Sequence, residues 1–513
     1  MRDHEPILID EFNGLWKRGD AESCPMDHFS DCDNLQYIQS GFKSRNSVQV
    51  LTVNQSCLNY QNVKRMYNYV HQEVQSLLVL DDQGNIYHTE SPTPCTPILT
   101  VVGMTDFAFV NFGGRAYISP HDGAIGLQNE FLYVYLGDGT TARKAAGSGP
   151  TGTTFAAANS GTTGHVEAGI HIFAVVYETD TGFLTKLGPV SGATTANDYY
   201  RFAQVTAPGA ESVNLTNVPV SPDSFVVARH IVATKLIDPT LFTGNLAGYQ
   251  FYFVPNGKID DNSTTSITVS FYDEELLDDA SHLLDIFEEI AAGVFLSSYH
   301  NRLVIGAQYG DPTDIDEYGL VSTAWASTAG EPEAIDSVDG AIVAPLEGNP
   351  LTNAVEYRDV LYLFKSARTY AYTDNGDVPA AWPLTVLEQG LGASVHGIAL
   401  VLDSGGTDVD YLLIINFTGV FLFNGAFIKP ELTWKIFDYW LGLGKSNYNL
   451  FQILNDSINQ VFYIVLNNGK MLYADYSNGL DYKNLRWSPW SVTGMNITTI
   501  ALINYNQLII GAL

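Results

Sequence analysis

The sequence predicts an all-β protein: a β-propeller of about six to eight blades, with an inserted immunoglobulin- or fibronectin-like β-sandwich domain and an N-terminal arm. Three observations lead to this prediction. Aromatic residues make up 12% of the chain, mostly Tyr (29) and Phe (26), beside many short β-branched runs. Short apolar strands separated by polar turns recur along most of the 513 residues. One long interval of different character interrupts this recurrence, within a chain long enough for two to four domains.

The turns between the apolar runs are typical of β-hairpins. "SLLVLDDQGNIYHT" places residues 81–85 between two strands, and "VFYIVLNNGKMLYADY" does the same with 467–469. "YLLIINFTGVFLFNGAFIK" contains two such turns, at 418–419 and 424–425. Asn-Gly and Asp-Gly tolerate positive φ and match the twist of paired strands, so these stretches predict antiparallel hairpins.

The spacing of the hairpins favours a propeller. Apart from the one gap, the interval is about that of a four-stranded blade, roughly 40–50 residues. Comparable strands begin near Leu77, Ala116, Leu303, Val360, Leu412, Val461 and Leu508. The sequence ends on a strand, "NQLIIGAL", which we expect to complete the first blade and so remove exposed sheet edges. A pair of β-sandwiches or a series of unrelated meanders is the alternative.

The gap has its own pattern. It opens with a low-complexity run, "AAGSGPTGTTFAAANSGTTG", typical of a flexible connector. Alternating strands with turns every 8–12 residues follow, the pattern of a small sandwich. The predicted organisation is therefore an N-terminal arm (1–45), a first part of the propeller (46–145), the inserted sandwich (146–280) and the rest of the propeller with its closing strand (281–513). A short acidic helix or linker, "DEELLDDASHLLDIFEEIAAG", leads back to the ring.

The charge of the chain excludes one class of function. With 56 acidic and 25 basic residues the formal net charge is −31, and such a surface repels nucleic acid. A sequence-specific reader of DNA or RNA is therefore not expected. The first residues, "MRDHEPILID", lack the apolar core of a signal peptide, and no apolar run has spanning length. We expect synthesis in the cytosol and no membrane span.

Strong catalytic motifs are missing from the sequence. We find no G-x-S-x-G, H-E-x-x-H, Walker loop, EF-hand loop or paired C-x-x-C, and "YSNGLDYKNLRWSPW" is only a loose echo of the sialidase aspartate box. The expectation is a protein that is not an enzyme and uses no cofactor or metal. A propeller glycosidase with paired carboxylates is the alternative. The acidic runs at 273–279 and 311–317 are better explained as solvated loops than as calcium sites.

Cysteine and histidine add no predicted site. Cys24, His28 and Cys32 are spaced by four and would share one face of a helix, but three ligands without a paired motif make zinc a weak hypothesis. All four Cys, including Cys57 and Cys95, are expected to be free thiols in a reducing compartment. Five further histidines are scattered along the sequence and suggest no shared site: His165, His171, His282, His300 and His396.

The opening segment resembles the start of tailed-bacteriophage virion proteins of the β-propeller tail-nozzle or tail-hub type. The residues that carry the resemblance are Phe12-Asn13-Gly14-Leu15-Trp16, Arg18, Pro25, Asp27, Asp31, Asn34, Gly41-Phe42 and Arg45. Further stretches are similar to the inserted domains and blades of the same proteins, among them "SVNLTNVPVSPDSFVVARHIVATK", "LVSTAWASTAGEPEAID" and "VLYLFKSARTYAYT". The resemblance touches most of the chain.

The resemblance implies a structural role. It implies a homo-oligomeric ring, commonly of six copies, located in the virion tail and assembled in the host cytoplasm. Its partners would be the tail adaptor or head-tail connector and tail fibres or a needle, and viral DNA would pass through without specific binding. A receptor-binding or tail-tip protein is a further alternative, although the sequence has no fibrous repeat.

The arm offers a candidate assembly interface. An exposed segment of mixed charge with aromatic anchors suits docking on a neighbour. The expected interface residues are Phe12, Gly14, Trp16, Arg18, Asp27, Asn34 and Arg45. The competing account is that residues 9 to 45 form the first propeller strands, with Phe12 and Trp16 in the core.

Overall fold

The computed structural model describes most of the chain. The described residues are 13–19, 24–25, 28–38, 41–45, 62–90, 96–150, 155–187, 203–238, 240, 249–309, 320–336, 338–343, 349–402, 410–444, 448, 451–503 and 507–512. They form two compact units: unit 1 comprises 1–143, 291–325 and 341–513, and unit 2 comprises 144–290 and 326–340. Within the described residues, no helix is long and apolar enough to cross a membrane.

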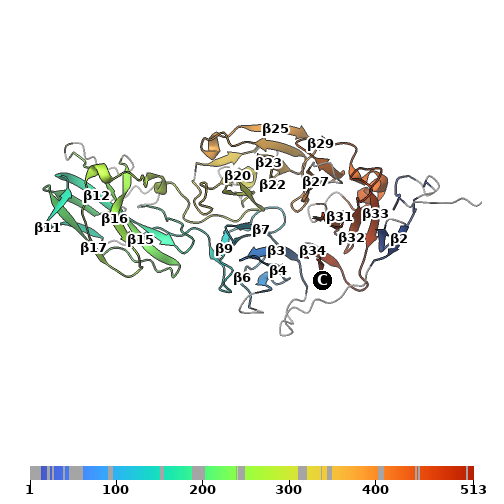
Figure 1. The fold of residues 1–513 in the computed structure, drawn as a ribbon, viewed down its shortest axis with the longest axis horizontal. Helices are drawn as coiled ribbons and strands as arrows, with labels where there is room; N and C mark the ends of the chain where they lie inside the picture. Colours follow the sequence, from blue (N-terminus) through green and yellow to red (C-terminus); the bar gives the residue numbers. More distant parts are fainter. Residues whose placement is uncertain are drawn as a thin grey trace, which may run out of the picture. The chain divides into compact units, whose positions relative to one another are not determined.

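Unit 1 is built from antiparallel sheets whose strands follow one another in chain order (Figure 1). The first three four-stranded sheets are β3(Arg65–His71), β4(Val74–Leu80), β5(Asn85–His88), β6(Leu99–Thr100); β7(Asp106–Phe112), β8(Arg115–His121), β9(Tyr133–Tyr135), β10(Arg143–Lys144); and β18(Phe295–Tyr299), β19(Arg302–Gly306), β20(Thr323–Ala326), β21(Gly340–Ile342). The next three are β22(Leu351–Tyr357), β23(Val360–Lys365), β24(Arg368–Tyr372), β25(Leu384–Gln389); β26(Ile398–Val401), β27(Tyr411–Asn416), β28(Gly419–Phe423), β29(Phe427–Ile428); and β30(Gln452–Asp456), β31(Val461–Val465), β32(Met471–Asp475), β33(Arg486–Trp490). A seventh sheet pairs β34(Ile497–Ile503) with β35(Gln507–Ala512).

The first strands of these sheets form a ring. β3 contacts β7, β7 contacts β18, β18 contacts β22, β26 contacts β30, β30 contacts β34, and β34 contacts β3. Asn353 of β22 completes the circuit, because its side-chain amide donates to the Val395 carbonyl just before β26 at 2.6 Å. Consecutive meander sheets whose innermost strands meet in a circle are the architecture of a β-propeller. Unit 1 is therefore a β-propeller with seven sheets among the described residues.

The predicted hairpins are confirmed. Each of the seven strands expected from the spacing is the second strand of its sheet: β4, β8, β19, β23, β27, β31 and β35. The turns at 81–85, 418–419, 424–425 and 467–469 each join two adjacent antiparallel strands.

Ring closure differs from the expected one. The last strand, β35, pairs with β34 and not with the first sheet, so it does not complete that blade. The amide of Val63 donates to the Ala512 carbonyl at 3.1 Å. Val63 and Met66 of the first sheet also pack in one apolar cluster with Ala501 and Ile509 of the last sheet. Side-chain packing between two separate sheets thus closes the ring, since β34 already supplies the backbone partner that β35 needs.

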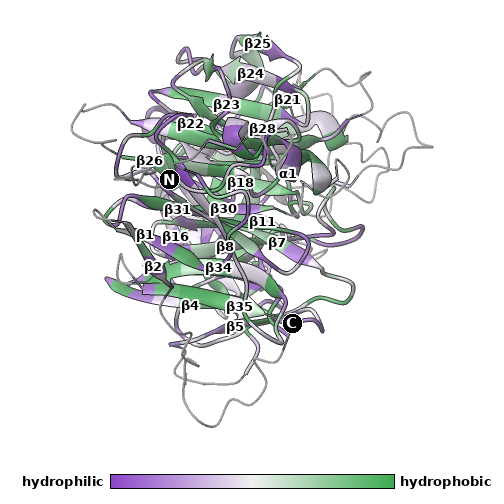
Figure 2. Ribbon diagram, turned by 90° about the vertical axis from the view of Figure 1, so that its right-hand side faces the viewer, coloured by the Kyte–Doolittle hydropathy of each residue, from purple (hydrophilic) through white to green (hydrophobic). Residues whose placement is uncertain are grey.

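A hairpin and several short helices lie outside the seven sheets of the ring. The hairpin, formed by β1(Leu35–Ile38) and β2(Gly41–Ser44), contacts β33 of the sixth sheet. The short helices η9(Leu432–Ile436) and α1(Phe437–Gly442) follow β29, and η6(Leu320–Ser322) and η8(Pro379–Ala381) lie in connections. In Figure 2 the strands are mostly hydrophobic and many loops are hydrophilic.

Unit 2 consists of two antiparallel sheets on one shared hydrophobic core, which includes Phe173, Val213, Ile231 and Phe271. One sheet has the order β11(Ala156–Val166), β14(Glu211–Thr216), β17(Ser266–Val269). The other has the order β13(Ala203–Ala207), β12(Gly169–Thr179), β15(Val226–Thr234), β16(Phe251–Ile259).

One expectation for this part of the chain was wrong. Residues 156–166, expected in a flexible connector, form strand β11, because the neighbouring strand β14 supplies hydrogen-bond partners that composition alone does not reveal. The acidic segment after the sandwich, expected to be a short helix or linker, contains the short 3-10 helices η4(Asp273–Glu275) and η5(Ser281–Leu284).

Candidate functional site

A buried polar network lies at the end of the propeller where the inner strands begin. Arg65 is the first residue of β3, Asp106 the first of β7 and Gln452 the first of β30. His121 ends β8, and His396 lies in the connection before β26. Inner strands start at the same end of a propeller, so residues far apart in sequence meet there.

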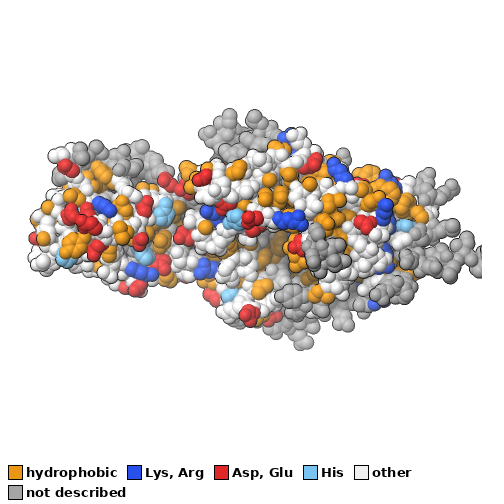
Figure 3. Space-filling view, turned by 45° about the horizontal axis from the view of Figure 1, so that its top comes forward, with side chains coloured by type: hydrophobic (Ala, Val, Ile, Leu, Met, Phe, Trp, Pro, Cys, Tyr) orange, Lys and Arg blue, Asp and Glu red, His pale blue; other side chains and the backbone are white. Residues whose placement is uncertain are grey.

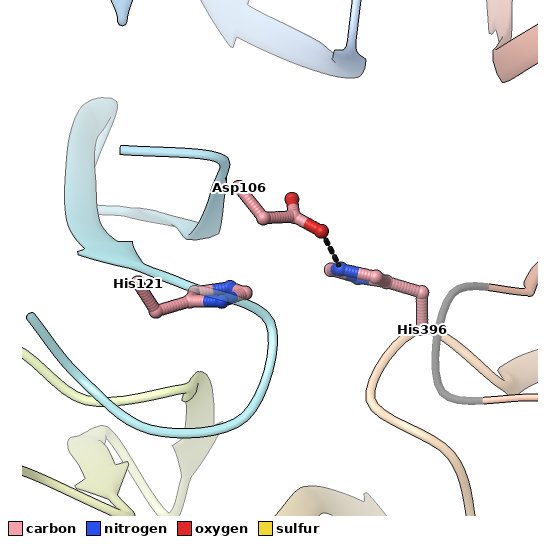
Figure 4. Close-up of side chains that lie close together, drawn as sticks. All are labelled: Asp106, His121 and His396. Atoms are coloured by element: carbon pink, nitrogen blue, oxygen red, sulfur yellow. Dashed lines mark hydrogen bonds and ion pairs between the residues drawn. The ribbon is translucent and has the colours of Figure 1, made fainter. Parts of the chain in front are cut away.

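One hydrogen bond of this network crosses the ring. His396 Nε2 lies 2.8 Å from an oxygen of Asp106, and 290 residues separate the two in sequence. Asp106 belongs to the second sheet and His396 precedes the fifth, so two sheets lie between them on the shorter way round the ring. Figure 4 shows the two side chains reaching toward each other from different parts of the chain, with the His121 ring beside them. The contact therefore spans the propeller axis.

Arg65 and Asp106 form the centre of the network. The Arg65 Nε and Nη2 groups donate to the two carboxylate oxygens at 2.9 and 2.6 Å, and both side chains are almost fully buried. The amide of Phe107 donates to Oδ1 as well, at 2.8 Å. Burial alone would raise the pKa of the Asp106 carboxyl, but the Arg65 guanidinium and then His396 outweigh burial and hold this pKa well below its usual range. Asp106 is therefore ionised at neutral pH.

The network contains a possible metal-binding cluster. The potential ligand atoms of His121, Asp106 and His396 lie within 4.8 Å of one another. Asp106 already accepts hydrogen bonds from Arg65, Phe107 and His396, and these occupy both of its oxygens. The Gly123 amide donates to His121 Nδ1 at 3.0 Å, which places the His121 proton on Nε2, the nitrogen that would have to bind a metal. A cation beside the Arg65 guanidinium would also be repelled. These residues do not fit a divalent metal.

The histidines are held in their neutral form. Burial lowers the pKa of His121 to about 4. Burial, and then the Arg65 charge, also lower the pKa of His396. His396 Nδ1 lies 3.1 Å from the Tyr67 hydroxyl, so its two nitrogens join the first sheet to the second across the axis. The arrangement is a cross-brace between sheets in which Arg65, Asp106 and His396 are paired with one another, while the buried Nε2 of His121 has no hydrogen-bond partner among the described residues.

A second histidine cluster lies in the inner hairpin turns. His300 Nε2 is 2.7 Å from Asp359 and its Nδ1 is 3.2 Å from Asp374. Hydrogen bonding to Asp359 is the main cause that raises the pKa of His300. Both nitrogens face carboxylates, which favours the protonated imidazolium, a form that does not bind a metal.

The structure places the expected arm residues against the chain's own propeller. The Leu15 amide donates to the Trp487 carbonyl at 3.1 Å, and Leu15 is buried. Gly14 has φ +85°, and a Cβ there would lie 2.8 Å from the Trp487 nitrogen, so only glycine fits. The Trp16 ring packs edge-on against Trp434 of η9 at 5.5 Å.

Arg18 and the second half of the arm are held in the same way. The Arg18 guanidinium lies 4.1 Å from the centre of the Trp434 ring. The Asn34 side-chain oxygen accepts from Arg45 Nε and from the Ser491 amide, both at 2.9 Å. Phe12 and Asp27 lie outside the described residues. For 13–19 these contacts favour the account in which the arm is part of the propeller, while its role as an assembly interface stays a prediction.

The other predicted residues are not brought together. Cys24, His28 and Cys32 do not lie on a helix in the described part of the arm. Burial raises the pKa of the Cys32 thiol to about 11, so it is an inert thiol. Sequence reasoning missed the central network, including the role of His396, because its members come from five separate segments. The one available signal was that Arg65, Asp106 and Gln452 each stand at the start of an apolar strand.

Comparison with known proteins does not assign this chain to a family. No model of a known family matches the sequence, and no curated protein matches it. Among solved structures, dihydro-heme d1 dehydrogenase NirN in complex with DHE aligns at 12% identity and TM-score 0.24, over 68% of this chain and 61% of that one. The Neurospora crassa Pan2 WD40 domain aligns at 8% identity and TM-score 0.28, over 82% of this chain and 89% of that one. The propeller assignment rests on the strand order and the ring of inner strands.

Proposed function

We propose that this protein is a non-enzymatic structural component of a bacteriophage tail, a nozzle or hub ring with sixfold symmetry. The ring forms part of the DNA-ejection conduit and an attachment platform for the adaptor and for fibres or a needle. The resemblance of the arm and blades to such proteins motivates the proposal. The observation that supports it is the cross-brace, because Asp106, Arg65 and His396 at the propeller axis are paired with one another.

The cross-brace also bears on where DNA would pass. The hydrogen bond of 2.8 Å between His396 and Asp106 crosses the propeller axis, and a DNA duplex is roughly 20 Å wide. The conduit in this proposal is therefore the lumen between copies and not the channel of one propeller. A net charge of −31 per copy would give that lumen a repulsive wall. On the face shown in Figure 3, acidic, basic and apolar side chains are interspersed.

Unit 2 has a place in this proposal. Its two sheets on one core are the arrangement of an immunoglobulin-like or fibronectin-like sandwich, inserted in the propeller sequence between β10 and β18. We assign it to contacts with neighbouring tail proteins.

The alternative of a carbohydrate-active propeller enzyme requires two carboxylates about 5–10 Å apart at the axis, one of them free to act as an acid. Asp106, the carboxylate in the described axial network, is paired with Arg65 and held well below its usual pKa. An ionised carboxylate cannot act as the general acid of glycoside hydrolysis, and this favours the structural role.

The proposal is tested by electron microscopy of the purified full-length protein across a concentration series, classified for ring symmetry. Closed rings with a lumen of roughly 20 Å or more are the expected result. Monomers at every concentration, also after addition of a chemical cross-linker, would contradict the ring.

A further inference from the structure

A groove lies between the fifth and sixth sheets of the propeller, with a cavity volume of about 570 Å³. Its lining includes Tyr411, Tyr476, Tyr482, Leu480, Asn478 and Lys429. Tyrosine with Ser, Asn and Gly is the composition of protein-recognition surfaces, since tyrosine supplies a large amphipathic contact area at low entropic cost. The segment 476–482, "YSNGLDY", provides much of this lining, and the central network does not use it.

The groove and its edge carry two lysines and one aspartate, on a protein that is acidic as a whole. Lys429 is exposed and makes no ion pair or hydrogen bond with another described residue. Lys483 lies beside the groove with its ammonium 5.6 Å from the Tyr482 ring centre. The acidic residue of the lining, Asp481, is occupied within its own turn, where it accepts from the Lys483 amide at 2.7 Å and the Asn484 side chain at 2.6 Å. The groove therefore offers apolar rings and cations to an acidic, apolar partner.

Unit 2 exposes a segment with the complementary chemistry. Residues 272–279, "YDEELLDD", contain five acidic residues and no basic one. Leu277 is 77% exposed and Tyr272 is 45% exposed, although both are large apolar side chains. Glu274 and Asp278 lie close to Leu277 in sequence and are exposed, and their carboxylates make no hydrogen bond or ion pair with another described residue, although the Asp278 carbonyl accepts from the Phe253 amide at 2.9 Å. Exposed apolar side chains inside an acidic segment are unfavourable in water and suit burial in a basic, aromatic groove.

We infer that the segment 272–279 of one copy of this chain docks in the tyrosine groove of a second copy. Leu277 would enter between the tyrosine rings, and Glu274 and Asp278 would pair with Lys429 and Lys483. Because groove and segment are different surfaces, the contact is head-to-tail, and repetition of a head-to-tail contact closes a ring when the rotation fits. This inference rests on the ring proposed above and specifies which surfaces join its copies.

The test uses charge reversal in the full-length protein, with self-association measured by analytical ultracentrifugation. A groove variant carries Lys429→Glu and Lys483→Glu, and a segment variant carries Glu274→Lys and Asp278→Lys. Each variant alone is expected to raise the dissociation constant of self-association at least tenfold. The variant with all four reversals restores the attraction and is expected to associate within about threefold of the wild type. A control with Glu73→Lys and Glu90→Lys changes the net charge as the segment variant does, at exposed positions of unit 1, and should associate like the wild type.

Mixing gives the second readout. A mixture of groove and segment variants contains one wild-type pair of surfaces and one pair in which both charges are reversed, so the mixture should regain association in assemblies where the two variants alternate. Leu277→Ser, at an exposed site that does not disturb folding, should also weaken association.

Rings that persist in both charge-reversed variants would overturn this contact and leave the ring itself standing, whereas a wild type that never associates would overturn both proposals. A change in the monomer's hydrodynamic radius that is independent of concentration would indicate engagement within one chain and would overturn the contact between copies.

Discussion

Asp106 accepts hydrogen bonds from its own β7 neighbour, from β3 and from the connection before β26. An ionised carboxylate in a buried position is stable only because the Arg65 guanidinium compensates it. At the scale of single residues, the Arg65–Asp106 ion pair and His396 therefore connect the first, second and fifth sheets.

Asp106→Asn is expected to destabilise the protein by about 3–5 kcal/mol, because it leaves the buried Arg65 charge without its partner. Asp31→Asn is the matched control, since Asp31 pairs with Lys17 at 3.6 Å in an exposed position and should cost at most about 1 kcal/mol. Denaturant unfolding measures both. Equal effects of the two changes would contradict the role assigned to Asp106.

Acid pH should weaken the fold through the buried histidines. Burial lowers the pKa of both His121 and His88 to about 4. The unfolded chain therefore takes up protons below about pH 6.5 while the native protein does not, so stability is present above that pH and is lost as pH falls towards 4. For His121 the loss is on the order of 3 kcal/mol. The contribution of His300 depends on pH in the opposite direction. Because its pKa is raised in the folded protein, the stability that it gives is lost as pH rises through that pKa.

His121→Asn isolates this contribution, because an asparagine oxygen can still accept from the Gly123 amide. Unfolding free energies at pH 7.5 and pH 5 should differ less in this variant than in the wild type. An unchanged difference would show that His121 does not contribute to the acid sensitivity.

At the scale of elements, the arm behaves as part of the sixth sheet. The Lys17 amide donates to the Lys435 carbonyl and the Asp438 amide donates to the Lys17 carbonyl, at 2.8 and 3.1 Å. Leu15 belongs to the same hydrophobic cluster as Trp487 and Phe462. Removal of this segment exposes both backbone groups and apolar surface.

Deletion of residues 1 to 20 is therefore expected to lower the unfolding temperature by several degrees, since a loss of about 1–3 kcal/mol follows from one buried leucine and the lost hydrogen bonds. Calorimetry of the truncated and full-length proteins measures the shift. An unchanged transition with weakened self-association would instead assign the arm to docking alone.

Local chemistry explains which elements could be predicted. The turn at 467–469 contains Asn-Gly, so the residues of the turn themselves predict the hairpin. The hairpin turns at Gln72-Glu73 and Arg358-Asp359 have positive φ without glycine, and only the strands on either side impose that conformation. Strand β11 has no apolar alternation, and its pairing with β14 comes from tertiary context. The cross-brace could not be predicted, because Arg65, Asp106 and His396 lie in segments far apart in sequence that only the closed ring brings together.

At the scale of the whole molecule, charge is the dominant property. The excess of 31 negative charges opposes binding to phosphates at any orientation of the chain. We expect no measurable affinity for duplex DNA at physiological salt, and fluorescence anisotropy with a labelled duplex checks this. Binding with a steep salt dependence would require a basic surface and would contradict the proposed passive conduit.

The cross-axis hydrogen bond has a consequence during protein synthesis. Asp106 and His396 are 290 residues apart, so at about 5–20 residues per second the ribosome supplies the second partner roughly 15–60 s after the first. Until then the early sheets exist as open fragments with unpaired edges, which are liable to aggregate. Propeller closure is therefore a late, largely post-translational event. A nascent chain of this length is an expected client of chaperones that bind unfolded segments, and its yield in a foreign host should respond to them.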